Sequence, residues 1–240
     1  MEAVNGIALV VGGSSGIGHS CVEALRGAGW STAVFDLKPD QDEDAIALDV
    51  RDREAVFAAV ADLVEAKGPL GTVVYAAGTA RVTPILEVEA KEWDLVLGVN
   101  LTGAFHALQA TAPHIAAGGS FTAISSIDSQ SPVPGLAPYC ASKAGVEALV
   151  RSAALELGPS GVRANAILPG LVRTPLMEAQ LQRPGVEDAF LAQTPLRGIA
   201  AGAEIGDVVA FLASPAARWI TGTSIPVDGG MALTEHPKLD

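Results

Sequence analysis

A glycine-rich turn near the start of the chain joins a short apolar run to a segment with helical spacing. The run covers residues 7–11 and is continuously apolar, as in a strand that is buried on both faces. The turn is Gly12-Gly13-Ser14-Ser15-Gly16-Ile17-Gly18, and residues 16–28 repeat apolar side chains at helical intervals. A strand, a tight turn and a helix in this order indicate a crossover to a parallel strand.

The same alternation continues to the end of the chain. We expect strands over residues 7–11, 32–35, 45–48, 72–76, 120–125, 162–168 and 224–227, and helices over 16–28, 51–66, 91–99, 101–115, 137–157 and 204–212. This order predicts an α/β fold, a single-domain Rossmann-like doubly wound parallel β-sheet flanked by helices on both faces. No linker divides the chain, so residues 1–240 are expected to form one domain.

Composition argues against several classes of protein. The 240 residues are 49% hydrophobic, and 27 acidic against 15 basic residues give a net charge of −12, which disfavours nucleic acid and membranes as partners. Two cysteines, Cys21 and Cys140, imply no disulfide framework, and the scattered histidines imply no metal site. Without a secretory signal or an apolar run of about 20 residues, the protein is expected to be cytoplasmic.

The glycine turn suits a dinucleotide cofactor. Gly12, Gly16 and Gly18 let a phosphate approach the backbone, and the following helix directs free N–H groups at it; an ordinary glycine-rich turn has the same composition. Asp36 ends the second expected strand, where a carboxylate accepts hydrogen bonds from a ribose diol and repels a 2′-phosphate. We therefore expect NAD rather than NADP, and interpret Lys38 as a solvated loop lysine, although it could reach a phosphate.

Tyr139 and Lys143 lie four residues apart on the helix expected over 137–157, and so share one face of it. A phenol ionises near pH 10, and a fixed ammonium beside it lowers its pKa, so the pair can act as a general acid and base. Ser126 ends an apolar strand, and Asn100 separates two helices. Each of these residues could also have a purely structural role. Tyr139 and Lys143 could be a half-buried ring beside a solvated amine, Ser126 could bond to local backbone at the strand end, and Asn100 could cap a helix.

In this order the residues resemble the short-chain dehydrogenase/reductase family, in its compact single-domain branch. The resemblance runs from Ile7 to Gly230 and includes Asp49-Val50, Ala76-Ala77-Gly78, Val99-Asn100, Pro169-Gly170 and Asp228-Gly229-Gly230. The chain has Val11-Gly12 where the family turn usually begins with Thr-Gly, and Tyr75-Ala76-Ala77-Gly78 where the family usually has Asn-Asn-Ala-Gly. We interpret both departures as apolar packing in place of a polar contact between strand ends.

The resemblance implies a role for each site residue. Tyr139 takes the alcohol proton as hydride leaves for C4 of the nicotinamide. Lys143 binds the nicotinamide ribose and lowers the tyrosine pKa, Ser126 orients the substrate oxygen, and Asn100 holds a water that links Lys143 to solvent. The cofactor-binding residues are then Gly12, Ser15, Gly16, Ile17, Gly18, Asp36, Asp49, Val50, Ala77, Gly78, Tyr139, Lys143, Pro169, Gly170, Val172 and Thr174.

Residues 175–198 correspond to the substrate flap of the family. The segment is rich in apolar residues, namely Leu176, Met177, Leu181, Val186, Phe190, Leu191 and Leu196, which either face a substrate or pack on the domain. We favour an apolar cyclic or aryl substrate, although Arg173, Arg183 or Arg197 could bind a carboxylate or phosphate. Asp128, close to Ser126, either faces the substrate or closes a turn.

The expected protein is thus an NAD-dependent short-chain alcohol dehydrogenase or ketone reductase, which transfers hydride between a secondary alcohol and its ketone. One alternative is a 3-oxoacyl thioester reductase of the acyl-carrier-protein type, against which Asp36 and the lack of a basic patch argue. Another is a non-catalytic nucleotide-binding sensor on the same fold. The helices over 101–115 and 137–157 are apolar on more than one face, and family resemblance implies a homotetramer.

Overall fold

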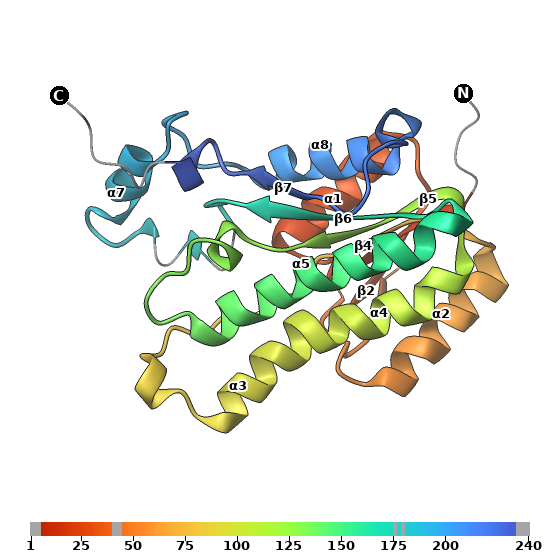
Figure 1. Ribbon diagram of the computed structural model, residues 1–240, viewed down its shortest axis with the longest axis horizontal. Helices are drawn as coiled ribbons and strands as arrows, with labels where there is room; N and C mark the ends of the chain where they lie inside the picture. Colours follow the sequence, from red (N-terminus) through yellow and green to blue (C-terminus); the bar gives the residue numbers. More distant parts are fainter. Residues whose placement is uncertain (1–5, 40–44, 175–176, 179–180, 234–240) are drawn as a thin grey trace.

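The computed structural model describes residues 6–39, 45–174, 177–178 and 181–233. Its strands form one sheet in the order β3-β2-β1-β4-β5-β6-β7, and every neighbouring pair is parallel (Figure 1). The strands are β1 (Ile7–Val11), β2 (Thr32–Asp36), β3 (Ala45–Ala47), β4 (Leu70–Tyr75), β5 (Ile115–Ile124), β6 (Arg163–Pro169) and β7 (Ser224–Val227). The sheet order reverses between β1 and β4, and such a reversal is where α/β folds bind ligands.

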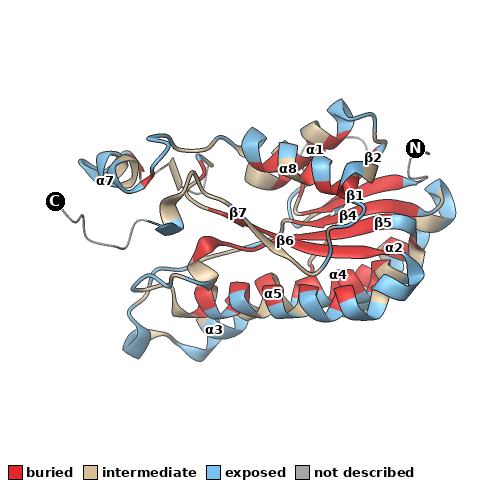
Figure 2. Ribbon diagram, turned by 45° about the horizontal axis from the view of Figure 1, so that its top comes forward, coloured by how far each residue is buried: buried red, intermediate tan, exposed pale blue. Residues whose placement is uncertain are grey.

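Helices cover both faces of the sheet, as Figure 2 shows. On one face lie α2 (Arg53–Lys67), α4 (Gly103–Thr111) and α5 (Ala137–Leu157), and on the other α1 (Gly16–Gly27) packs against α8 (Gly202–Ala213). This arrangement confirms the Rossmann-like α/β fold that the alternation of strands and helices predicted. In the described part of the chain, no helix is long and apolar enough to cross a membrane.

Two apolar cores lie on opposite sides of the sheet. Successive residues of a strand point to opposite faces, so Leu9 joins the core under α2, α4 and α5, whereas Ala8 and Val10 join the core under α1 and α8. All three side chains are fully buried. Burial on both faces explains why the central strands read as continuous apolar runs rather than as alternating ones.

β5 begins five residues earlier than expected. The helix predicted over 101–115 ends at Thr111, a short 3-10 turn follows at Ala112–His114, and the strand starts at Ile115. The register of the strand then jumps, because Leu70 pairs with Ile115 but Thr72 pairs with Ser120. Gly119 permits this detour, since a Cβ there would lie 2.5 Å from a backbone oxygen of β4. The alanines and glycines in the detour have no strand pattern, which is why the sequence predicts no element over residues 116–119.

Two further segments differ from expectation. The helices predicted on either side of residue 100 form one rod, in which α3 (Ala90–Leu97) passes through a π-helical turn (η2, Gly98–Thr102) into α4. The flap segment contains a helix, α7 (Val186–Gln193), which begins after Gly185 with φ of 75°. Of the expected flap, residues 175, 176, 179 and 180, including Leu176, lie outside the described residues.

Candidate active site

The carboxyl ends of the parallel strands meet at one edge of the sheet, on the left in Figure 1, together with α7 and the first turn of α5. All the site residues expected from the sequence come from segments that follow these strand ends or from the helices that begin beside them. The fold therefore gathers the glycine turn, the Ser126 region and the Tyr139 helix at the edge where α/β proteins bind ligands.

The glycine turn packs too closely for any side chain at two positions. Gly12 has φ of +84°, and a Cβ on it would lie 2.4 Å from the backbone nitrogen of Ala77; a Cβ on Gly18 would lie 1.8 Å from the carbonyl oxygen of Gly12. The N-cap residue of α1, Ser15, makes no side-chain capping hydrogen bond, so the first N–H groups of α1 remain available for a phosphate. These features fit a bound dinucleotide.

Asp36 lies against this turn, at the end of β2. Its carboxylate accepts hydrogen bonds from the backbone N–H of Ser14 at 3.1 Å and of Lys38 at 2.9 Å. The two N–H groups fix the carboxylate at the edge of the turn, where a ribose diol of a dinucleotide would lie. The Asp36 carbonyl also accepts from Leu48, which ties β2 to the segment with Asp49 and Val50.

Asp49 and Val50 differ in their surroundings. The Asp49 carboxylate pairs with Arg51, whose guanidinium lowers the pKa of that carboxyl. Val50 is buried beneath α4, where its side chain contacts the position of Gly103. Of this pair, only Asp49 keeps polar atoms near the surface, so Val50 can contribute shape and backbone groups but no charge.

Asn100 is fully buried in the π turn and links the loop after β4 to the helix α5. Its Oδ1 accepts from the backbone N–H of Thr79 at 2.8 Å, and its Nδ2 donates to the Thr79 carbonyl at 3.0 Å and to Ser142 Oγ at 2.9 Å. Thr79 follows Ala77-Gly78, so Asn100 fixes the loop after β4. A π turn exposes irregular backbone and often occurs at functional sites.

Two serines that the sequence did not single out also shape the site. Ser142 Oγ donates to the Tyr139 carbonyl at 2.7 Å while it accepts from Asn100, and Ser125 Oγ donates to the Lys143 carbonyl at 3.0 Å. Both serines are buried and both bind the helix turn that carries the tyrosine and the lysine. Serines lack a pattern of their own in a sequence; only their positions next to Ser126 and Lys143 could have marked them.

Ser126, Tyr139 and Lys143 come together at the end of β5. Burial raises the pKa of Tyr139 to about 12, and a hydrogen bond with the Ser126 side chain opposes the rise. Lys143 Nζ lies 5.6 Å from the centre of the Tyr139 ring and donates to the Ile124 carbonyl at 2.8 Å. Burial lowers the pKa of Lys143 to about 8. Burial is the largest influence on the pKa of both groups, and the groups that shift the pKa of Tyr139 do not include Lys143.

The remaining cofactor candidates lie beyond β6. Gly170 follows Pro169, and a Cβ on it would lie 2.8 Å from Asp228 Cβ, so the Asp228-Gly229-Gly230 segment packs directly on this turn. Val172 forms a parallel bridge with Ala200, which brings together the two ends of the segment that contains α7. Thr174 reaches back to the glycine turn, 3.7 Å from the position of a Cβ on Gly16. These residues thus surround the same space as the glycine turn.

Tyr75, which stands where the family usually has asparagine, makes both apolar and polar contacts. Val11 and Tyr75 are paired on neighbouring strands and belong to the same buried core, which confirms that apolar packing joins the strand ends. The Tyr75 hydroxyl, however, donates to the carbonyl of Val99 in the π turn. The polar link is therefore kept, but it connects β4 to the helix rather than to β1.

Metal and thiol chemistry have little support among the described residues. In them, no three His, Cys, Asp or Glu side chains are placed to hold a metal ion. Cys21 and Cys140 are both buried free thiols. Burial raises the pKa of Cys21 to about 12 and also raises that of Cys140, so neither forms a reactive thiolate readily.

Comparisons with known proteins agree with this geometry. A family model described as "Enoyl-(Acyl carrier protein) reductase" matches residues 11–232. The 3-oxoacyl-[acyl-carrier-protein] reductase of Staphylococcus aureus is 34% identical over 242 residues, covering 94% of this chain and 98% of its own. The (3R)-3-hydroxyacyl-CoA dehydrogenase of Rattus norvegicus is 35% identical, covering 95% and 96%.

Among solved structures, the blue fluorescent protein from a metagenomic library, in complex with NADPH, superposes with a TM-score of 0.89. The two sequences are 29% identical, and the superposition covers 96% of this chain and 100% of the other. The match extends over almost the whole sheet and its flanking helices rather than over one motif. The protein is an oxidoreductase that belongs to the short-chain dehydrogenase/reductase family.

Proposed function

We propose that the protein is a single-domain, NAD-dependent oxidoreductase that interconverts a secondary alcohol and its ketone. The observation that carries the proposal is the meeting of Ser126 with Tyr139 at the end of β5, above the buried amine of Lys143. A bound nicotinamide supplies a hydride acceptor or donor. Ser126 positions the substrate oxygen, and Tyr139 takes the alcohol proton or returns it to the ketone.

The lysine has a second task in this proposal. Its pKa of about 8 lets Lys143 exchange a proton near neutral pH, and its Nζ lies beside the spaces above Gly78 and Asn100. A Cβ on Gly78 would lie 3.5 Å from Lys143 Nζ and 3.7 Å from Asn100 Oδ1. In this proposal Lys143 would bind the nicotinamide ribose and accept the tyrosine proton, and Asn100 would hold a water that links Lys143 to solvent.

Asp36 supports NAD as the cofactor. Its carboxylate, held by Ser14 and Lys38, would accept from a ribose diol and would repel a 2′-phosphate. The similar metagenomic protein binds NADPH, so the choice must be tested on this chain.

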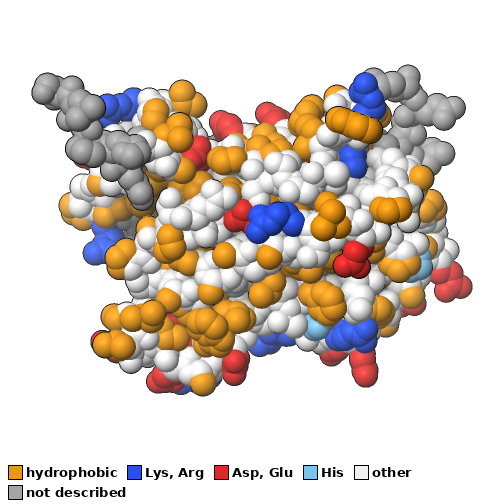
Figure 3. All heavy atoms as spheres, viewed as in Figure 1, with side chains coloured by type: hydrophobic (Ala, Val, Ile, Leu, Met, Phe, Trp, Pro, Cys, Tyr) orange, Lys and Arg blue, Asp and Glu red, His pale blue; other side chains and the backbone are white. Residues whose placement is uncertain are grey.

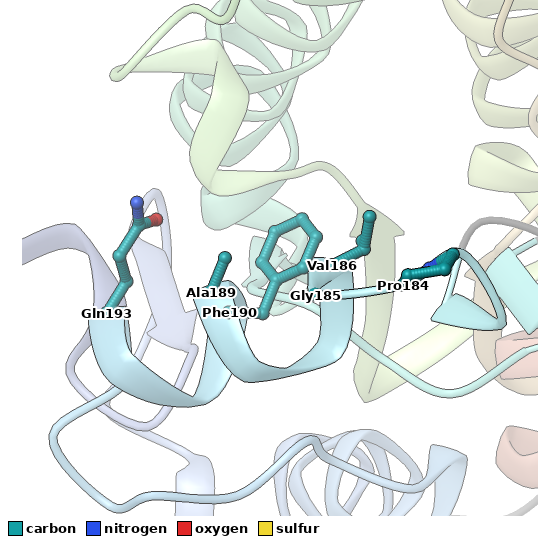
Figure 4. Close-up of a pocket in the computed structure, with 6 residues that line it drawn as sticks. All are labelled: Pro184, Gly185, Val186, Ala189, Phe190 and Gln193. Atoms are coloured by element: carbon teal, nitrogen blue, oxygen red, sulfur yellow. The ribbon is translucent and has the colours of Figure 1, made fainter.

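The surface around the site supports an apolar substrate. Figure 3 shows hydrophobic side chains gathered at the lower left, around the short turn η1 (Ile85–Glu87), where Val82, Ile85 and Leu86 are exposed. In Figure 4, Val186, Ala189 and Phe190 project from the same side of α7 into a hollow also lined by Pro184. An apolar cyclic or aryl ring would bury against such surfaces.

Reduction of a 3-oxoacyl thioester is the second candidate. The similar S. aureus and rat proteins carry names for acyl substrates, and an acyl chain would also fit the apolar surface at η1 and α7. Reduction of such a thioester would use the same Ser126 and Tyr139 hydroxyls, since the reacting group is again a secondary alcohol or ketone.

Initial-rate assays would test both candidates. Hydride transfer is followed by cofactor absorbance over a panel of aryl, cyclic and aliphatic secondary alcohols and 3-hydroxyacyl thioesters, with NAD and NADP in parallel. We expect aryl or cyclic alcohols with NAD to give the highest kcat/KM. Tyr139→Phe should abolish turnover and retain NADH binding. A Tyr139→Phe variant that keeps most activity, or a wild type that transfers no hydride, would overturn the proposal.

A further inference from the structure

Asp128 places a carboxylate beside the two hydroxyls of the proposed site. It lies in the short turn η4 (Ile127–Ser129) that follows β5, and its backbone N–H donates to Ser126 Oγ at 3.1 Å. The Asp128 carboxyl also forms a side-chain hydrogen bond with Ser126. Its charge raises the pKa of Tyr139 and of Cys140, which agrees with a carboxylate close to the first turn of α5.

The turn itself does not need this carboxylate. Other aspartates in turns of this protein accept backbone N–H groups with their side chains, as Asp36, Asp52 and Asp228 do. In η4 the capping is done by Ser126 Oγ, and no backbone N–H of the described residues donates to the Asp128 carboxylate. A closing role for the Asp128 side chain is therefore unsupported.

Among the described residues, the carboxylate has no counter-ion. No lysine or arginine in that part of the chain forms an ion pair with Asp128, and Lys143 directs its Nζ to the Ile124 carbonyl. The described groups that interact with the carboxylate are Ser126, Tyr139 and Cys140, none of which is cationic. Asp128 is half-buried, so its charge is only partly hydrated, and burial raises the pKa of the carboxyl.

This charge opposes the chemistry proposed for Tyr139. A carboxylate near the phenol disfavours the phenolate that forms when the tyrosine gives up its proton. A substrate with a cationic or hydrogen-bond-donating group beside the carbinol carbon would neutralise Asp128 as it binds. A substrate with a carboxylate there would add a second uncompensated negative charge.

We infer that Asp128 is a specificity-determining residue, which selects alcohols that carry a hydrogen-bond donor, best an ammonium group, on the carbon next to the carbinol. The inference rests on the proposed alcohol oxidation and narrows its substrate class. The apolar hollow at α7 would hold the ring of the substrate, and Asp128 would hold its single polar substituent.

Three matched phenyl carbinols and one anionic compound provide the probes. Phenylethanolamine, phenylethylene glycol and 1-phenyl-1-propanol carry an ammonium, a hydroxyl and a methyl group on the carbon next to the same benzylic carbinol, and mandelate carries a carboxylate on the carbinol carbon itself. With NAD, kcat/KM for the ammonium compound should exceed that for the methyl compound at least about tenfold, as expected for a charge-assisted hydrogen bond. The diol should be intermediate and mandelate the poorest. The preference should weaken as pH falls through the Asp128 pKa, because the protonated carboxyl no longer attracts a cation.

Asp128→Asn preserves the shape and removes the charge, so it should bring the ammonium and methyl compounds to within about threefold of each other. Asp128→Ala should do the same. An ammonium-to-methyl ratio that is unchanged in both variants, or a wild type that prefers mandelate, would overturn the inference.

The binding of the same four alcohols to the NADH-loaded protein, measured by calorimetry, requires no hydride transfer and should show the same order. Loss of turnover with all alcohols, while Asp128 still controls this binding, would overturn the proposed function alone. Turnover without any such order in binding would overturn the inference alone.

Discussion

Lys143 keeps an amine that titrates near neutral pH in a fully buried position. The folded pKa of about 8 lies below the ordinary value of 10.5, so folding expels a proton that the unfolded chain holds. The free energy of unfolding therefore rises as pH rises from about 8 to 10.5. Below pH 8 the buried amine is charged, which costs roughly 3 kcal/mol of stability. Such a cost is typical of a functional group kept at the expense of stability.

Lys143→Met should therefore stabilise the cofactor-free protein while abolishing activity. Near neutral pH we expect a gain of about 2 kcal/mol in the free energy of unfolding, after a loss of about 1 kcal/mol for the hydrogen bond to Ile124. The gain should shrink as pH rises from about 8 towards 10.5. Urea denaturation measures it, with the exposed Lys91→Met as a control. A gain that is absent, or constant with pH, would contradict this account.

Asp36 should decide the cofactor. NAD should be preferred over NADP by well over tenfold in kcat/KM, which requires only about 1.4 kcal/mol of differential binding. Asp36→Ala should reduce this preference because the 2′-phosphate is no longer repelled. Steady-state kinetics with both cofactors measures the ratio, and Lys38→Ala, two residues away, tests whether that lysine contributes to the use of NADP. Equal efficiency of the wild type with NADP would show that Asp36 does not select the cofactor.

At the scale of an element, α1 offers a matched pair of glycines. A Cβ on Gly18 would overlap the Gly12 carbonyl oxygen, whereas nothing lies within 4 Å of a Cβ on Gly27. Gly18→Ala should thus displace the glycine turn and weaken NADH binding at least about tenfold, or about 1.4 kcal/mol. Gly27→Ala should leave binding unchanged and stabilise the helix by about 0.5–1 kcal/mol. Calorimetric titration measures NADH binding, and thermal unfolding measures stability. Similar NADH affinities of the two variants would refute the close-packed turn.

The helix α7 should set the response to substrate hydrophobicity. If the ring or chain of the substrate buries against α7, kcat/KM should rise about threefold to fourfold per methylene, at about 0.8 kcal/mol each. The double variant Met177→Ala, Phe190→Ala should flatten this slope over a homologous series of alcohols. Phe211→Ala on α8, also a partly exposed phenylalanine, is the matched control. A polyol without an apolar ring or chain that outperforms every apolar alcohol would exclude an apolar site.

At the scale of the whole molecule, we expect a homotetramer. α4 and α5 cover the sheet with one face, yet they expose Phe105 (43%) and Leu155 (81%) on the other. Apolar side chains on the outer face of a helix favour burial against another copy of the chain. Sedimentation velocity at micromolar concentration should give a tetramer, and Phe105→Glu with Leu155→Glu should give smaller species. A monomeric wild type would contradict the expectation.

The sequence predicted the order of strands and helices, because buried parallel strands and amphipathic helices leave strong periodic patterns. It did not predict α7 or the detour before Ser120, where pairing depends on glycines and on neighbouring strands. For the site, the sequence pointed to Asn100, Ser126, Tyr139 and Lys143, whose catalytic roles stay a prediction. The supporting roles of Ser125 and Ser142 were not, since a buried hydroxyl depends on contacts made only in three dimensions.

The π turn at Gly98–Thr102 makes chain length, as well as residue type, a requirement of the site. A π turn contains about one residue more than an α turn, so α4 is rotated by roughly 100° relative to a straight continuation of α3. This rotation lets α3 pack on α5 while α4 packs on α2. Deleting any single residue here would restore a regular helix but turn one half of the rod away from its neighbour. No substitution elsewhere could then return Asn100 to its position, so this segment should tolerate point changes far better than deletions.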